Sequence, residues 1–78
     1  MNLGKLTIIV SWDNLNENSP EDLKDKMLFE KSIIGYISTF ETLPLIGLCI
    51  DNDNCDTGKI ERIVFNGITK TITVYLEF

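Results

Sequence analysis

The stretch Gly58–Phe78, GKIERIVFNGITKTITVYLEF, decides the fold expected for this chain. Asn66-Gly67 lies between two segments rich in β-branched residues, which predicts a β-hairpin with a two-residue turn. Successive side chains of a strand point to opposite faces. One face of the second segment is apolar apart from Lys70, and it comprises Ile68, Ile72, Val74, Leu76 and Phe78. The other face carries Thr69, Thr71, Thr73, Tyr75 and Glu77.

The two-residue turn also predicts how the two strands pair. It places Phe65 opposite Ile68 and Glu61 opposite Ile72. Glu61 would then be a diagonal neighbour of Lys70, close enough to form an ion pair. In the same register the threonine row is paired with Ile60, Arg62 and Val64. We interpret this mixed face as a candidate interaction surface made of Thr69, Thr71, Thr73, Tyr75 and Arg62.

Three elements are expected before the hairpin. Lys5–Trp12 alternates between apolar and polar residues and predicts a strand. Ser19 and Pro20 suit the N-cap and the first position of a helix, which is expected from about Pro20 to Glu30. The apolar run Leu45–Ile50, LIGLCI, predicts a short buried strand.

The segment from Lys31 to Glu41, KSIIGYISTFE, fits two elements. Its apolar residues match helical spacing, which would extend the helix to Glu41. Its many β-branched residues, and Gly35 at a cost of about 1 kcal/mol inside a helix, narrowly favour a strand over Ser32–Phe40. A strand here gives five strands and allows a partly closed barrel. A helix gives the order β-α-β-β-β.

The expected fold is therefore α+β, a single domain over residues 1–78. It has a small, mostly antiparallel sheet of four to five strands, one helix packed on one face and a C-terminal β-hairpin. A chain of 78 residues has a thin core, because so short a chain buries only about 60% of its unfolded surface. Forming a homo-oligomer is a natural way to bury more.

The charge balance is acidic, with 12 Asp and Glu against 7 Lys and Arg, no histidine and a net charge of −5. This balance argues against direct nucleic-acid binding, which needs clustered basic residues. It is compatible with a basic protein partner. The acidic residues that could face such a partner are Asp13, Glu17, Glu21, Asp22 and Asp25.

No apolar run approaches the roughly 20 residues of a membrane span, and the first residues lack the pattern of a secretory signal. We therefore expect a cytoplasmic protein with no membrane association. In a reducing compartment Cys49 and Cys55 are expected as free thiols, and a bridge between them is the alternative.

Catalytic, cofactor-binding and metal-binding residues are not expected. The loop Asp51–Asp56, DNDNCD, begins like a calcium loop, but Cys55 takes the third ligand position and Asp56 replaces the glycine of the turn. Cys55 also has no histidine that could activate its thiol. The sequence therefore predicts a protein that is not an enzyme.

Two functions remain as hypotheses. The first is a small acidic protein-binding module, able to inhibit a larger protein by occupying a basic surface on it. The alternative is a structural or assembly subunit that forms a homo-oligomer through its sheet faces or edges. The identity of the partner does not follow from the sequence.

Overall fold

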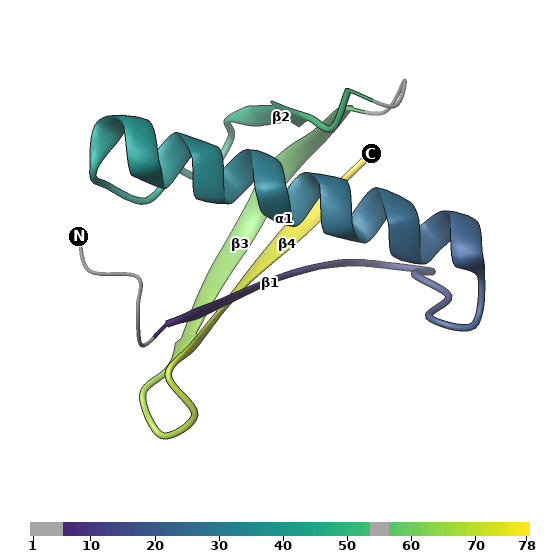
Figure 1. Ribbon diagram of the computed structural model, residues 1–78, viewed down its shortest axis with the longest axis horizontal. Coiled ribbons are helices and arrows are strands. Elements are labelled where there is room, and N and C mark those ends of the chain that lie inside the picture. Colours follow the sequence, from purple (N-terminus) through teal and green to yellow (C-terminus); the bar gives the residue numbers. More distant parts are fainter. Residues whose placement is uncertain (1–5, 54–56) are drawn as a thin grey trace.

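The computed structural model describes residues 6–53 and 57–78 and has an α+β fold with one helix and a four-stranded sheet (Figure 1). The elements are β1 (Thr7–Trp12), α1 (Pro20–Phe40), β2 (Cys49–Asp51), β3 (Thr57–Asn66) and β4 (Thr71–Glu77). The sheet order is β1-β4-β3-β2, in which β1 is parallel to β4 and the other two pairings are antiparallel. The α+β class is thus confirmed, and the sheet is mixed because β1 enters it parallel to its neighbour.

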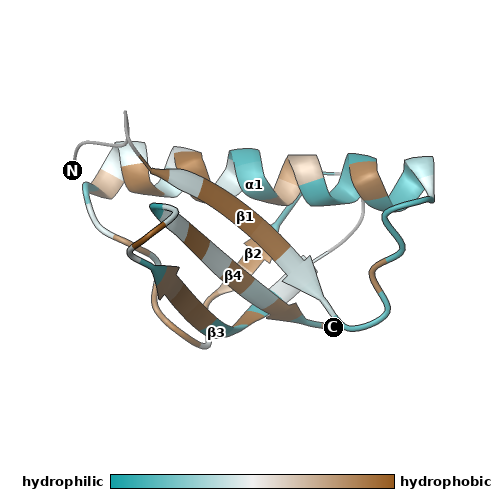
Figure 2. Ribbon diagram, turned by 90° about the horizontal axis from the view of Figure 1, so that it is seen from below, coloured by the Kyte–Doolittle hydropathy of each residue, from teal (hydrophilic) through white to brown (hydrophobic). Residues whose placement is uncertain are grey.

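Helix α1 lies across one face of the sheet (Figure 2) and is a single element of 21 residues. At its start, the side chain of Ser19 accepts a hydrogen bond from Asp22 N at 3.4 Å, and Pro20 follows as expected. At its end, Glu41 adopts a left-handed conformation with φ of 56° and donates its N–H to Ile37 O. The narrow preference for a strand over Ser32–Phe40 is therefore wrong.

The helix continues because of what it buries. Phe29, Ile33 and Ile37 are four residues apart, so one stripe of α1 carries all three, and each is buried against the sheet. Burying one such side chain contributes roughly 1.5–3 kcal/mol, which exceeds the cost of Gly35. Gly35 itself is exposed. Tertiary packing thus overrides the local preference for a strand.

The hydrophobic core lies between α1 and the sheet. Its members come from every element of the fold. They are Ile8, Val10, Phe29, Ile33, Ile37, Ile50, Ile60, Ile72, Val74 and Leu76. Among the described residues, no helix is both long enough and apolar enough to cross a membrane.

The hairpin forms, but its turn is longer than predicted. It spans residues 67–70, and Asn66 is paired with Thr71. The Asn66 Oδ1 atom accepts hydrogen bonds from Ile68 N at 2.9 Å and Thr69 N at 3.2 Å, so Asn66 caps the turn from its first end. Lys70, with φ of 56°, closes the turn.

The pairing predicted from a two-residue turn is consequently wrong. Phe65 lies opposite Ile72, and Ile68 is in the turn with 95% of its side chain exposed. Glu61 is not opposite Ile72 and forms no ion pair with Lys70. The register differs by an even number of residues, so the faces of β4 are unchanged. As predicted, β4 buries Ile72, Val74 and Leu76.

A β-bulge interrupts β3 at Glu61. Ile60 is opposite Leu76 and Arg62 is opposite Tyr75, so Glu61 is the extra residue. The bulge turns Ile60 into the core, where it is fully buried, and away from the face on which we expected it. Arg62 stays on the opposite face with Tyr75.

The predicted strand over Leu45–Ile50 is wrong for its first four residues. Leu45 and Ile46 are 76% and 66% exposed, and Leu48 N donates to Leu45 O in a tight turn. Gly47 adopts φ of 93°, a conformation that glycine tolerates and that a strand does not use. Only Cys49–Asp51 joins the sheet, with Ile50 pointing into the core.

Candidate functional site

The face of the sheet opposite α1 is covered by no other element among the described residues (Figure 2). On this face, residues that are paired between β1 and β4 and between β4 and β3 form rows across the sheet, for example Ile9, Thr73 and Val64. We call this surface the open face. It consists of Ile9, Ser11, Arg62, Val64, Thr71, Thr73 and Tyr75.

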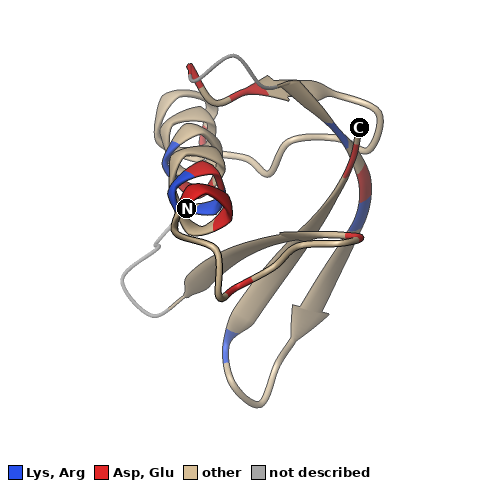
Figure 3. Cartoon of the chain, turned by 90° about the vertical axis from the view of Figure 1, so that its right-hand side faces the viewer, with Lys and Arg blue, Asp and Glu red and all other residues tan. Residues whose placement is uncertain are grey.

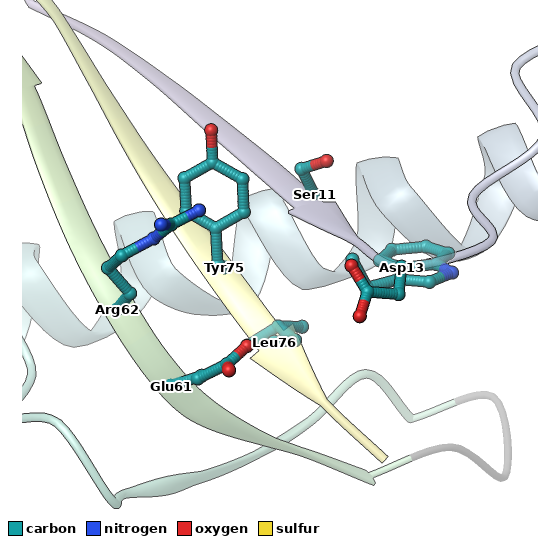
Figure 4. A pocket seen from close by; sticks show the side chains of 7 residues that line it. Ser11, Asp13, Glu61, Arg62, Tyr75 and Leu76 are labelled. Carbon is teal, nitrogen blue, oxygen red and sulfur yellow. The ribbon is translucent and has the colours of Figure 1, made fainter.

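Most of the interaction surface expected from the sequence lies on the open face. Thr71, Thr73 and Tyr75 come from β4, and Arg62 comes from β3. Thr69 does not belong to it, because Thr69 is part of the turn between the two strands. The Arg62 guanidinium carbon lies 4.2 Å from the centre of the Tyr75 ring (Figure 4), a cation–π contact that holds both side chains in place.

A cavity of about 410 Å³ opens at the end of the open face. Figure 4 shows Ser11 and Asp13 on one side of it, and Glu61 and Arg62 on the other. A second cavity of about 270 Å³ adjoins it. We call the two together the acidic cavity. The residues that line both parts are Trp12, Asp13, Glu61 and Leu76.

The two sides of the acidic cavity come from different local structures. Asp13 directly follows β1, at the point where the chain leaves the sheet. Glu61 is the extra residue of the β3 bulge. Glu77, near the end of β4, lines the adjoining part and lies 4.0 Å from Lys59.

The charges of the acidic cavity favour a cationic ligand group. Its carboxylates come from Asp13, Glu61 and Glu77, and the cation at its border, Arg62, is already stacked on Tyr75. Carboxylates accept strong hydrogen bonds from ammonium and guanidinium groups. The Trp12 ring supplies an apolar wall for the methylene stem of a Lys or Arg side chain.

The five residues of the predicted acidic surface have different surroundings in the structure. Figure 3 shows acidic residues on the first turns of α1 and in the loop before it. Glu17 and Glu21 are exposed. Asp22 accepts a hydrogen bond from Asn16 N at 2.9 Å, and Asp25 accepts one from Asn52 Nδ2 at 3.3 Å. Of the five predicted residues, Asp13 lines the acidic cavity.

The sequence did not predict that Glu61 and Asp13 line the same cavity. One signal was present in the segment Ile60-Glu61-Arg62-Ile63. Two isoleucines three residues apart cannot both face the core of a regular strand, so their spacing indicates a bulge between them. Such a bulge pushes one additional charged residue toward solvent.

The remaining candidates from the sequence carry no site in the described part of the chain. Across residues 6–53 and 57–78, no three His, Cys, Asp or Glu side chains are grouped closely enough to hold a metal ion. Cys49 is an exposed free thiol. Cys55 and Asp56 of the calcium-like loop lie outside the described residues, so the expectations for them stay predictions.

Comparison with protein-family models, with curated proteins and with solved structures gave no match to this chain.

Proposed function

We propose that this protein is a small acidic protein-binding module that docks on a basic surface of a larger protein through the open face and the acidic cavity. The observation that carries the proposal is the continuity of the two features. Ser11, Arg62 and Tyr75 belong to the open face and also line the cavity. A partner that lies on the open face is therefore in position to insert a side chain into the cavity.

The composition of the open face supports this proposal. Tyrosine and arginine are enriched at the energetic centres of protein interfaces, and here Tyr75 and Arg62 are already stacked. A side-chain pair held in place before binding loses less conformational entropy on association. Ile9 and Val64 add apolar area at either side of Thr73, whose hydroxyl can form hydrogen bonds.

The charge of the molecule supports a basic partner. A net charge of −5 attracts a cationic surface over a distance set by the ionic strength. A Lys or Arg of the partner would enter the acidic cavity between Asp13 and Glu61. Each charge-assisted hydrogen bond made there contributes roughly 1.5–3 kcal/mol. By occupying that basic surface in the cytoplasm, the module would act as an inhibitor.

The proposal is tested by comparing which proteins are captured by wild type and by matched variants. Asp13→Asn with Glu61→Gln removes the charge of the acidic cavity while keeping the shape of both side chains. Glu17→Gln with Glu21→Gln removes the same charge from exposed positions away from the cavity. Tyr75→Ala removes the aromatic centre of the open face.

We expect a basic protein that binds wild type and the Glu17/Glu21 variant, but binds the cavity variant and Tyr75→Ala at least about ten-fold more weakly. Its affinity should fall as NaCl rises from about 50 mM to about 500 mM. Equal capture by all four proteins, or binding that is insensitive to salt, would contradict the proposal.

A further inference from the structure

Helix α1 carries apolar residues on two sides, and only one of these sides is covered. Its inner side is buried against the sheet. Three further apolar residues of the helix, Leu23, Met27 and Ile34, have exposed fractions of 38%, 56% and 40%. Figure 1 shows α1 in front of the sheet, with no other described element across its outer side. The helix therefore presents an apolar surface to solvent.

The three exposed residues form a single stripe. Met27 follows Leu23 by four positions and Ile34 follows Met27 by seven, and residues at these spacings lie on one side of a helix. We call the three residues the outer stripe. It extends over roughly 16 Å, because a helix rises about 1.5 Å per residue. Spacings of four and seven also characterise the apolar seam between two helices that pack lengthwise.

A hollow of about 470 Å³ lies along the first half of the outer stripe. Its surface is mostly apolar, so it suits apolar side chains of a partner. The residues that line it all belong to α1, and they are Pro20, Leu23, Lys24, Met27, Leu28 and Lys31.

The charge beside the hollow is opposite in sign to that of the whole protein. Lys24 and Lys31 are its charged lining residues, and both are exposed. Neither forms an ion pair with a described residue. The whole chain, in contrast, has a net charge of −5. The outer side of α1 is thus a local cationic surface on an acidic protein.

The carboxylates of α1 do not neutralise this surface. Asp22 and Asp25 accept hydrogen bonds from segments outside the helix. Glu30 accepts one from Val10 N at 2.9 Å, at the outer edge of β1, and the Lys26 Nζ atom is 3.0 Å from the same Glu30 oxygen. No described carboxylate lines the hollow. Carboxylates that pair with the two lysines must therefore come from a partner.

We propose that the outer stripe binds an amphipathic acidic helix of a partner protein. The partner helix packs along α1, with apolar side chains on the stripe and carboxylates against Lys24 and Lys31. These lysines are seven residues apart, about 10 Å along the helix, which matches two acidic residues one heptad apart in the partner. Charged residues beside an apolar seam select a partner through such ion pairs. This surface is separate from the open face, so the inference does not depend on the proposed function.

The charge pattern disfavours two other occupants. A second copy packed through the same stripe would bring the lysines of both copies into one interface, where like charges repel. An anionic lipid surface is extended and would interact with the whole protein, whose net charge is −5. A single helix contacts only the lysine-lined side of α1, because charges further away than about 8 Å are screened at physiological ionic strength.

The test measures binding of a defined acidic helix to the full chain. The probe is a capped, fluorescently labelled peptide of about three repeats of Ile-Ala-Ala-Leu-Glu-Gln-Glu, and binding is followed by fluorescence anisotropy. Its glutamates flank the apolar seam and oppose pairing of the peptide with itself. A control peptide carries Lys in place of each Glu, so it keeps the apolar seam and reverses the charge.

Two variants alter the outer stripe at exposed positions, where the fold should tolerate them. Met27→Glu places a carboxylate at the centre of the stripe. Lys24→Gln with Lys31→Gln removes both charges beside the hollow. The matched controls make the same exchanges at exposed positions outside α1, and they are Ile68→Glu and Lys59→Gln with Lys70→Gln.

We expect wild type and both control variants to bind the acidic peptide with a Kd on the order of 100 μM, since the stripe contains only three apolar residues. Met27→Glu should bind it at least about ten-fold more weakly, and the Lys24/Lys31 variant about five-fold more weakly. No binding to wild type at about 1 mM protein would overturn the proposal. So would equal binding by all variants that circular dichroism shows to be folded.

Three further outcomes would assign the stripe differently and also overturn the proposal. Binding of the lysine peptide that depends on Met27 as strongly would show that charge does not select the partner. A dimer of the chain alone in sedimentation equilibrium, abolished by Met27→Glu, would make the occupant a second copy. Co-sedimentation with vesicles of anionic lipid, lost in the Lys24/Lys31 variant, would make it a membrane surface.

Discussion

The two faces of β4 show how differently one strand can be used. Ile72, Val74 and Leu76 lie under α1 and are almost fully buried, whereas the alternate residues Thr73 and Tyr75 keep part of their surface exposed on the open face. Neighbouring residues of β4 lie on the same backbone but on opposite faces. The difference in their exposure therefore arises because α1 covers only one of the two faces. Stability is therefore concentrated on the covered face, and the open face is free to carry a binding surface.

The largest expected effect tests the covered face. Phe29→Ala removes a fully buried ring that contacts Trp12 and Phe78 at centroid distances of 5.9 and 5.8 Å. We expect a loss of about 3–5 kcal/mol in the free energy of unfolding, measured by urea denaturation. Phe65→Ala is the control, because Phe65 is 60% exposed near the hairpin turn, and it should cost far less. Similar losses for both variants would refute the comparison.

A smaller effect is expected where the covered face meets the sheet edge. Glu30→Ala leaves Val10 N without its acceptor and should cost about 1–3 kcal/mol. Glu30→Gln keeps an acceptor oxygen and should recover most of that loss. Amide hydrogen exchange of Val10 reports the same contact, with protection reduced in Glu30→Ala. Unchanged protection in that variant would show that the Glu30 carboxylate does not shield the Val10 N–H at the outer edge of β1.

The sequence was sufficient for the parts of the fold that depend on alternation. The strand near Trp12, the helix start at Ser19 and the two faces of β4 were predicted from residue patterns, since an element boundary or a buried face depends on local chemistry. The Ser32–Phe40 segment was predicted wrongly, because its outcome depended on the sheet against which Ile33 and Ile37 pack.

The candidate site was predicted less completely. Thr71, Thr73, Tyr75 and Arg62 were assigned to one face correctly, because an even shift in register leaves faces unchanged. The acidic cavity was not predicted, because it needs residues that are distant in sequence to meet across three strands. The hairpin register was also missed, since the Asn66 side chain closes a longer turn than the Asn-Gly pair suggested.

A gain in stability is expected on the outer side of α1. Gly35→Ala places a methyl group where no atom beyond its chain neighbours and the adjacent helix backbone lies within 4 Å, and it reduces the conformational freedom lost when the helix forms. We expect an increase of about 0.5–1 kcal/mol in the free energy of unfolding. Gly47→Ala is the control with the opposite sign, because φ at Gly47 is 93°. A loss in Gly35→Ala would mean that this side of the helix is packed against something.

The smallest expected effect comes from a matched exchange between the two faces of β4. Thr73→Val replaces a hydroxyl by a methyl group on the open face and should change the free energy of unfolding by less than about 0.5 kcal/mol. Val74→Thr makes the reverse exchange one residue further on, where the side chain is fully buried, and should cost about 1–3 kcal/mol because the new hydroxyl loses its contact with water. Both variants have nearly the same shape as wild type, so the difference between them measures the environment of each face.

If Thr73→Val proves as costly as Val74→Thr, the open face is packed in solution, and the proposed docking surface is already occupied. If the two differ as expected, Thr73→Val becomes a probe of partner binding that leaves the fold intact.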